Sequence, residues 1–347
     1  MILFLAQYPY AGQEQEGMNQ RIIAMDDHFA DRSRSYLFIS HRQYWRRKKR
    51  EIKPGVQHYY CNTFLHFFFI LSLLRRADQY YVHSVVHVLA FLLYLPFFSR
   101  KKRLIWDVHG VAPEEQTLAG NATRAKQYAL CERVLMKRAQ VAICVTDRMV
   151  VHYKQKYPWA HITYQVYGIL PAHLLQDAYE LAPVQPSDIV NVIYSGNTQR
   201  WQHITLMLQC IREHRAPHIH YTILTGDLQG MRQQLKEAGL EHEPTITLAK
   251  VAAHELKSYY SRAHYGFILR DDIAVNQVAC PTKMVEYLYY GMVPIVKSAD
   301  IGDFKALGYE YISYRDFSKQ VNPVKSRVNH ELAKQLLQKK MKCLSII

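Results

Sequence analysis

The sequence predicts an α/β protein made of two domains, each with a parallel sheet covered by helices. Short apolar runs alternate with amphipathic segments along nearly the whole chain, which is the pattern of repeated strand–helix units. The 347 residues are enough for two domains of about 150–180 residues, each with its own core. The Pro-rich stretch at 182–187 (APVQPS) is typical of a linker. We therefore expect domains at 1–181 and 188–322, followed by a C-terminal helical segment at 323–347.

In the first domain, buried apolar runs mark the strands and amphipathic segments mark the helices. The expected strands are Ile2–Ala6, Ser35–Ser40, Gln79–Val82, Leu104–Val108, Val141–Val145 and Ile162–Tyr167. The expected helices are Asn19–Phe29, Ser84–Leu95, Thr123–Arg138 and Thr146–Lys156. The two longest apolar runs, Phe64–Leu74 and Val82–Phe98, fall short of the roughly 20 clean apolar residues that a membrane-spanning helix needs.

The second domain repeats the pattern. Its expected strands are Ile189–Tyr194, Tyr221–Thr225, Thr245–Leu248, Tyr265–Leu269 and Val293–Val296, and its expected helices include Glu255–Arg262 and His330–Met341. A further short helix follows Pro281, with Thr282 as its expected cap. Gly291 is expected to end that helix in the left-handed conformation.

The formal charge of +15 favours an anionic partner: a nucleic acid, a membrane surface or a phosphorylated ligand. Two basic runs contribute to it, Arg42–Lys53, with interleaved aromatics, and Arg100–Arg103. Basic clusters beside apolar aromatic helices suggest a face that lies on an anionic membrane. Nucleic-acid binding or an ordinary solvated loop would explain the same residues. Six scattered cysteines without metal-site spacing, and no signal peptide, predict a reduced cytoplasmic protein.

The segment Gly266–Ile295 is the most informative part of the chain. It predicts a strand, a polar loop, a helix, a glycine and another strand, and ligands of such units lie at the carboxyl ends of the strands. Arg270 follows the strand and Lys283 lies in the first helical turn, where the positive end of the helix dipole favours phosphate. Glu286 comes three residues later on the same face, suited to accept hydrogen bonds from vicinal hydroxyls. An exposed Lys–Glu pair is the plain alternative.

Two other loops place chemistry after predicted strands. Asp107, His109 and Glu114 follow Leu104–Val108, although a lone histidine there is more often structural. Ser195-Gly196 follows Ile189–Tyr194, and a glycine in this position lets backbone approach a ligand closely, while Arg200 can meet a phosphate. A simple turn with a solvated arginine is the alternative.

The run P-T-K-M-V-E-Y-L-Y-Y-G-M-V-P-I at 281–295 resembles the donor site of retaining GT-B glycosyltransferases, in particular family 4-like enzymes. The resemblance implies two Rossmann-like domains facing across a cleft. It implies that Glu286 holds the ribose of a nucleotide-sugar and that Lys283 and Arg270 meet its diphosphate. The better-known motif has a second glutamate where this chain has Val278, so that sugar contact is unassigned; Asn276 or a nearby backbone N–H could replace it.

Other segments share the resemblance. Asp-x-His-Gly with Pro-Glu-Glu near 107–115 implies that His109 faces the donor sugar and the reaction centre, with Glu114 as acceptor contact or supporting acid. Tyr-Ser-Gly with Trp-Gln near 194–202 implies that Gly196 and Arg200 meet the diphosphate. The loop at Val251 would cradle the base, and the loop containing Gly17 would lie over the catalytic cleft. The resemblance also implies that the C-terminal helix in 323–347 crosses back onto the first domain.

These observations predict a metal-independent glycosyltransferase without a bound cofactor. Its donor would be a UDP- or GDP-linked sugar, and its acceptor a glycan or polyprenyl-linked intermediate. The enzyme would be cytoplasmic, with a peripheral position on the inner face of the membrane as an extension of the charge argument. Two alternatives stay open: a basic α/β protein that binds nucleic acid, and a glycosyltransferase relative that has lost activity.

Overall fold

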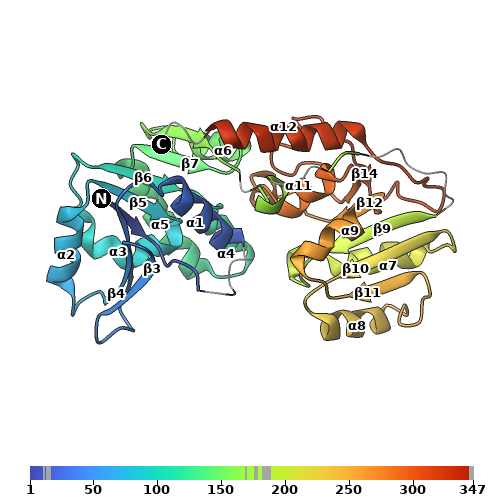
Figure 1. Ribbon diagram of the computed structural model, residues 1–347, viewed down its shortest axis with the longest axis horizontal. Coiled ribbons are helices and arrows are strands. Elements are labelled where there is room, and N and C mark those ends of the chain that lie inside the picture. Colours follow the sequence, from blue (N-terminus) through green and yellow to red (C-terminus); the bar gives the residue numbers. More distant parts are fainter. Residues whose placement is uncertain (11, 13–16, 169, 176–178, 182–188, 344–347) are drawn as a thin grey trace. The chain divides into compact units, whose positions relative to one another are not determined.

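The computed structural model describes residues 1–10, 12, 17–168, 170–175, 179–181 and 189–343. The chain divides into two compact units, Met1–Ile169 and Leu170–Ile347 (Figure 1). This division comes before the expected domain end at 181, because Leu170 and Leu174 pack in a core of the second unit. The linker predicted at 182–187 lies outside the described residues.

The first unit is built on an eight-stranded sheet in the order β3-β4-β2-β1-β5-β6-β7-β8. Its neighbouring strands are parallel except for β3 and β4, which pair antiparallel. The strands are β1 (Ile2–Leu5), β2 (Arg34–Ser40), β3 (Lys48–Lys53), β4 (Val56–Asn62), β5 (Gln79–His83), β6 (Arg103–Asp107), β7 (Val141–Cys144) and β8 (Thr163–Val166). Central strands such as β1 and β5 are buried along their whole length, as parallel strands covered on both faces must be.

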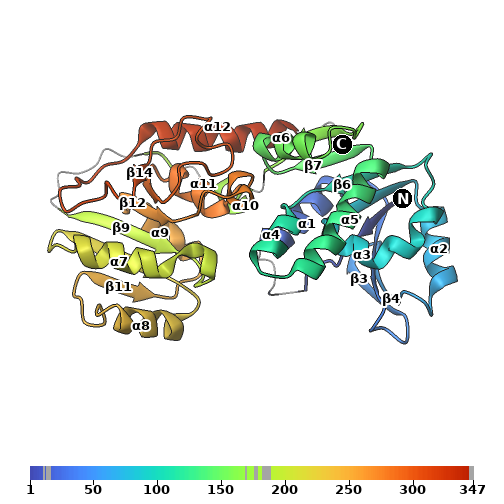
Figure 2. The ribbon, with the colours of Figure 1, turned by 180° about the vertical axis from the view of Figure 1, so that it is seen from behind.

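Helices cover both faces of this sheet, with α1 and α5 on opposite sides (Figures 1 and 2). The helices are α1 (Gly17–His28), α2 (Phe67–Arg76), α3 (Val88–Phe91), α4 (Ala112–Leu118), α5 (Ala122–Arg138) and α6 (Asp147–Lys156), with 3-10 turns η1 (Val85–His87) and η2 (Leu92–Phe97). α5 begins after Asn121, whose side chain accepts a hydrogen bond from the backbone N–H of Arg124.

The second unit has a six-stranded sheet in the order β11-β10-β9-β12-β13-β14, and all its pairs are parallel. The strands are β9 (Val190–Ser195), β10 (Ile219–Leu224), β11 (Ile246–Ala249), β12 (Tyr265–Ile268), β13 (Val293–Val296) and β14 (Ile312–Ser313). The helices are α7 (Ile204–His214), α8 (Leu228–Glu237), α9 (Leu256–Tyr260), α10 (Ala274–Gln277), α11 (Thr282–Tyr289) and α12 (Arg327–Cys343), with 3-10 turns η3 (Ala172–Leu175), η4 (Arg200–Gln202) and η5 (Ala253–Glu255).

Two hydrophobic cores lie on the two faces of the second sheet. On one face, α7 and α8 pack against Val192 and Tyr194 of β9. On the other face, α9 and α11 pack against Ile193 and Ile268, and α12 covers α11 through Leu332. The alternation of Val192, Ile193 and Tyr194 between the cores follows the two-residue period of a strand. The C-terminal helix therefore belongs to the core of the second unit.

Two expectations about local structure are wrong, and one alternative is excluded. The basic run Arg42–Lys53 contains strand β3, paired through a turn at Gly55 with β4, so this run is not simply a solvated loop. The segment expected as one helix at Ser84–Leu95 is a succession of η1, α3 and η2, which contains Pro96 near its end. α11 has Pro281 as its N-cap residue and no side-chain cap, so Thr282 is its first helical residue.

The expected end of α11 is confirmed. Gly291 has a φ of 66°, and its N–H donates to the carbonyl of Leu288. None of the described helices combines the length and apolar character needed to cross a membrane.

Candidate donor site and the Asp107 cluster

Each sheet has one switch point, a pair of neighbouring strands from which the connections run to opposite sides along the sheet. In the second sheet this position lies between β9 and β12, since β9 pairs with both β10 and β12. In the first sheet it lies between β1 and β5. Ligands of doubly wound folds bind at the carboxyl ends of the strands at such positions. In the second unit, the predicted site residues follow β9 and β12, the two strands at this position. In the first unit, they follow β1 and β6, and β6 is the strand next to β5.

Lys283 lies in the first turn of α11 and reaches toward the end of β9. Its Nζ is 4.2 Å from the ring centre of Tyr194 and 3.3 Å from Oε1 of Gln202. A Cβ on Gly196 would lie 2.8 Å from that Nζ, so a glycine is needed for this approach. Burial, assisted by the charge of Arg270, lowers the pKa of Lys283 to about 7. A bound anion would therefore stabilise the protonated lysine.

Glu286 lies one helical turn after Lys283 and is 14% exposed. Its Oε2 accepts a hydrogen bond of 3.2 Å from the hydroxyl of Tyr260, and its Oε1 is 3.6 Å from Nε2 of His173. Burial raises the pKa of Glu286 to about 7, although Tyr260 and Lys283 oppose the shift. The hydrogen bond from Tyr260 leaves acceptor capacity on a carboxylate, which is the property a vicinal diol requires.

Arg270 follows β12 directly, and its Nη1 donates to Oδ1 of Asn276 over 3.2 Å. The amide of Asn276 is buried, and its Nδ2 donates to the backbone carbonyl of Asp271. Both polar atoms of Asn276 are thus engaged, so its side chain orients Arg270. Val278, in the place of the family's second glutamate, is buried with the apolar core residues.

The remaining predicted residues of the second unit lie on neighbouring loops. Arg200 begins η4 after β9, and its side chain lies outside the described part of the structure. Val251 follows β11 and packs against the core that contains α11. Gly17, in the first unit, is the first residue of α1 after the loop that follows β1.

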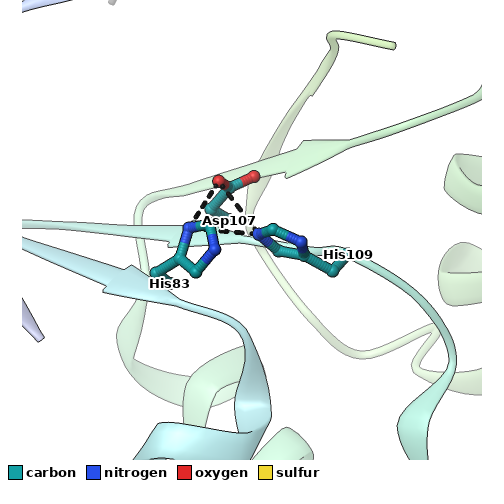
Figure 3. Close-up of side chains that lie close together, drawn as sticks. All are labelled: His83, Asp107 and His109. Atoms are coloured by element: carbon teal, nitrogen blue, oxygen red, sulfur yellow. Dashed lines mark hydrogen bonds and ion pairs between the residues drawn. The ribbon is translucent and has the colours of Figure 1, made fainter. Parts of the chain in front are cut away.

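The carboxyl ends of β5 and β6 in the first unit bring His83, Asp107 and His109 together (Figure 3). Nε2 of His109 is 3.1 Å from Nδ1 of His83. Oδ2 of Asp107 is 3.2 Å from Nδ1 of His83 and 3.4 Å from Nε2 of His109. Burial lowers the pKa of His83 to about 3 and also lowers the pKa of His109, where Asp107 opposes the shift. Both imidazoles are therefore neutral near pH 7.

Asp107 is the centre of this cluster. Its Oδ1 accepts from Nε of Arg21 at 2.7 Å, and its Oδ2 accepts from the hydroxyl of Tyr81 at 2.7 Å. Burial opposes the negative charge, but Arg21 and the histidines outweigh it, so the pKa of Asp107 is well below its ordinary value. Arg21 also donates to the carbonyl of Tyr167 over 2.6 Å. The result is a completely buried ion pair that joins α1, β6 and the end of β8.

The spacing of these three side chains is also compatible with a metal ion. Among the described residues, one group has ligand atoms close enough together to bind a single metal ion, all within 4.8 Å of one another: His83, Asp107 and His109. However, Arg21 already neutralises Asp107, and an added cation would lie beside the buried guanidinium. The hydrogen bonds present favour a network that fixes the orientation of His109.

Glu114 lies in α4, outside this cluster. Its Oε1 is 2.7 Å from Nζ of Lys156, which also contacts the buried Glu132 at 2.6 Å. Although burial opposes ionisation, His152 and Lys156 lower the pKa of Glu114 to about 2. Glu114 is therefore a carboxylate held by Lys156, which fits a hydrogen-bond acceptor better than a proton donor.

The sequence interpretation did not include several residues that complete these groups. In the first unit they are His83, Arg21 and Tyr81, and in the second they are Tyr194 and Tyr260. His83 carries a signal that could have been used, because it ends a strand as His109 nearly does. The others become visible only through contacts between distant parts of the chain, such as Arg21 with Asp107.

No protein-family model matches this sequence, and no curated protein sequence matches it. Solved structures do match over nearly the whole chain. Sucrose-phosphate synthase from Thermosynechococcus elongatus has a TM-score of 0.66 at 12% identity, covering 97% of this chain and 94% of its own. A trehalose-6-phosphate synthase structure from E. coli has a TM-score of 0.65 at 11% identity, covering all of both chains.

The fold is that of the GT-B glycosyltransferases. HepE from Anabaena, solved with UDP and glucose, matches as well, with a TM-score of 0.60 at 12% identity, over 99% of this chain and 92% of its own. The prediction of two α/β domains and of a GT-B architecture is confirmed. Membership of family 4 stays a prediction.

Proposed function

We propose that this protein is a glycosyltransferase that transfers a hexose from a UDP- or GDP-linked donor. The supporting observation is the donor site of the second unit, where Lys283 lies beside the backbone of Gly196 and the charges of Arg270 and Glu286 act on Lys283. Two cations and a backbone approach suit a diphosphate, and a nearby carboxylate suits a ribose. Solved proteins of the same fold include one in complex with UDP-glucose and one bound with UDP-2-fluoro glucose.

In this proposal, Lys283 and Arg270 stabilise the negative charge that develops on the leaving diphosphate. Such preorganised charges are often the largest electrostatic contribution to catalysis. They take the place that a divalent cation has in metal-dependent transferases, so we expect a metal-independent reaction. Glu286 binds the ribose, Asn276 positions Arg270, and Arg200 and Val251 contribute to the nucleotide pocket.

His109 is the proposed contact to the donor sugar, and Asp107 with His83 holds its ring. Its Nε2 is engaged with His83, so its Nδ1 is the atom that remains for a sugar hydroxyl. Glu114 is the proposed acceptor contact. Retention of configuration at the anomeric carbon is proposed from the resemblance of the donor motif. The acceptor is proposed to be a glycan or a polyprenyl-linked intermediate of polysaccharide synthesis at the cytoplasmic face of a membrane.

Thermal unfolding with a panel of UDP- and GDP-sugars tests the donor class. A true donor at 100 times its Kd should stabilise the protein by about 2.7 kcal/mol. Glu286→Ala should remove this stabilisation, while Glu237→Ala, at an exposed position in α8, should retain it. Failure of every nucleotide-sugar and nucleoside diphosphate to stabilise the wild type would refute the proposal.

Activity tests the finer points. Donor hydrolysis or transfer should persist in the presence of a chelator, and the product should keep the anomeric configuration of the donor. Nucleotide binding without hydrolysis or transfer to any glycan or lipid-linked acceptor would instead indicate a relative that has lost activity.

A further inference from the structure

The positive charge of this protein is concentrated in one part of the first unit. Between Arg32 and Trp106 the sequence has 15 lysines and arginines but only two acids, Glu51 and Asp78, so this segment has a net charge of +13. The whole chain has +15, so the remaining residues contribute only +2. The net charge is therefore concentrated in this segment of the first unit, and the second unit, with its donor site, contributes little to it.

Helix α2 presents apolar side chains to solvent within this segment. Ile70, Leu71, Leu73 and Leu74 face the core. Phe68 on the opposite face is 84% exposed, and Phe64 and Leu65, just before the helix, are 65% and 57% exposed. Large apolar side chains exposed singly are ordinary, but three within five consecutive residues form a patch.

The structure brings the two basic runs to either side of this patch. From the first run, the guanidinium of Arg47 lies 4.0 Å from the ring centre of Phe69 in α2. From the second side, Phe97, which precedes the run Arg100–Arg103, makes an edge-to-face contact with Phe67 at 5.7 Å. α2 also ends in two exposed cations, Arg75 and Arg76. Figure 1 shows α2 at the outer edge of the first unit, beside the hairpin of β3 and β4.

These cations are largely unneutralised by the protein itself. Among the described residues, Lys53 forms ion pairs with two acids, at 2.7 Å to Asp26 and 2.6 Å to Asp27. It is the one cation that does so in the three basic stretches, Arg42–Lys53, Arg75–Arg76 and Arg100–Arg103. Lys102 is engaged with backbone carbonyls at the end of α2. The others include exposed side chains such as Arg46, Lys49 and Arg100.

We propose that this face binds the surface of an anionic lipid bilayer. The face consists of Phe64, Leu65 and Phe68, flanked by the basic run that begins at Arg42, by Arg75 and Arg76, and by the run that begins at Arg100. Exposed aromatic and leucine side chains beside a helix enter the boundary between headgroups and acyl chains, and the cations meet anionic headgroups. A single-stranded nucleic acid would use the cations and can stack bases on Phe64 and Phe68, but it gives Leu65 no role, whereas a bilayer uses all three side chains. The proposal concerns the first unit alone and does not depend on the transfer reaction.

Co-sedimentation with vesicles tests the proposal on the full chain at low salt. We expect binding to vesicles that contain phosphatidylglycerol and at least tenfold weaker binding to pure phosphatidylcholine vesicles. Phe68→Ser should weaken binding about tenfold, whereas Leu130→Ser, at an exposed position in α5, should not. Arg46→Glu with Arg100→Glu, one change from each run, should weaken it about a hundredfold, and Arg232→Glu with Lys236→Glu in α8 should not.

All these positions are exposed, so the variants should keep the thermal midpoint of the wild type and its stabilisation by nucleotide-sugars. Equal binding to both kinds of vesicle, or no effect of Phe68→Ser and of the double charge reversal, would overturn the proposal. Tight binding of RNA or DNA that is insensitive to Phe68→Ser, with no vesicle binding, would assign the surface to nucleic acid instead.

Discussion

Binding of a nucleotide-sugar should be linked to proton uptake by Lys283 and proton release by Glu286. The pKa of Lys283 is lowered from 10.5 to about 7, and that of Glu286 is raised from 4.5 to about 7. A diphosphate favours the protonated lysine, so bound ligand should raise the pKa of Lys283. A ribose hydroxyl that donates to Glu286 favours the carboxylate, so bound ligand should lower the pKa of Glu286.

The magnitudes follow from these values. At pH 8 only about one-tenth of Lys283 is protonated in the free protein, so it should take up about 0.9 proton while Glu286 releases about 0.1, a net uptake of about 0.8. At pH 6 about nine-tenths of Glu286 is protonated, so it should release about 0.9 proton while Lys283 takes up about 0.1, a net release of about 0.8. The net proton exchange should therefore change sign near pH 7. Affinity should be highest around pH 7, falling at higher pH as Lys283 loses its proton and at lower pH as Glu286 gains one.

Titration calorimetry in buffers with different ionisation enthalpies measures this exchange directly. The ligand should be a sugar-linked nucleotide, because its diphosphate has no group that titrates near pH 7. Lys283→Met should abolish the uptake at pH 8, and Glu286→Gln should abolish the release at pH 6. Lys236→Met, at an exposed lysine in α8, should keep both. Uptake and release that persist in the first two variants would refute the reasoning.

Four further outcomes are expected. Gly196→Ala places a Cβ 2.8 Å from Nζ of Lys283 on a backbone whose φ of 154° L residues rarely adopt, so it should weaken nucleotide-sugar binding about 10- to 100-fold, as measured by calorimetry, and should also lower the thermal midpoint. Asn276→Ala should lower affinity about tenfold through Arg270, with a smaller effect in an Arg270→Ala background, which a double-mutant cycle would reveal. Asp107→Asn leaves the buried Arg21 without its carboxylate and should lower the free energy of unfolding by about 3–5 kcal/mol, whereas Asp78→Asn, at an exposed ion pair, should leave the thermal midpoint nearly unchanged. His109→Ala should lower the rate of sugar transfer while leaving donor affinity within about threefold, as kinetics and calorimetry would show together.

The sequence was sufficient for most of the architecture because parallel strands are continuous apolar runs. Val293–Val296 and the end of α11 at Gly291 agree with expectation, and so does the placement of Lys283 in the first turn of that helix. The edge strand β3 could not be recognised, because its residues Lys48–Lys53 are mostly charged and show no apolar alternation. The cap of α5 was also missed, because the helix was expected to begin at Thr123 and the structure has Asn121 as its cap.

The candidate sites were predicted in outline, through residues near strand ends. What sequence reasoning could not supply was the set of partners that fix those residues. Arg21 and Asp107 are 86 positions apart and meet only because α1 packs across the sheet. Likewise, the approach of Lys283 to Tyr194 depends on the parallel placement of β9 and β12.

The described groups of the proposed donor site, from His173 to Glu286, all come from the second unit, which also contains the C-terminal helix in its core. By contrast, the first unit depends on its own N-terminal helix, because Arg21 supplies the only guanidinium that the described structure places against Asp107. Removing the N-terminal segment that contains Arg21 would therefore leave the buried carboxylate of Asp107 without its cationic partner. A fragment that starts near Leu170 would keep every described group proposed to bind the nucleotide, and of the donor contacts would lose only the proposed sugar contact of His109, so it suits nucleotide soaking and spectroscopy.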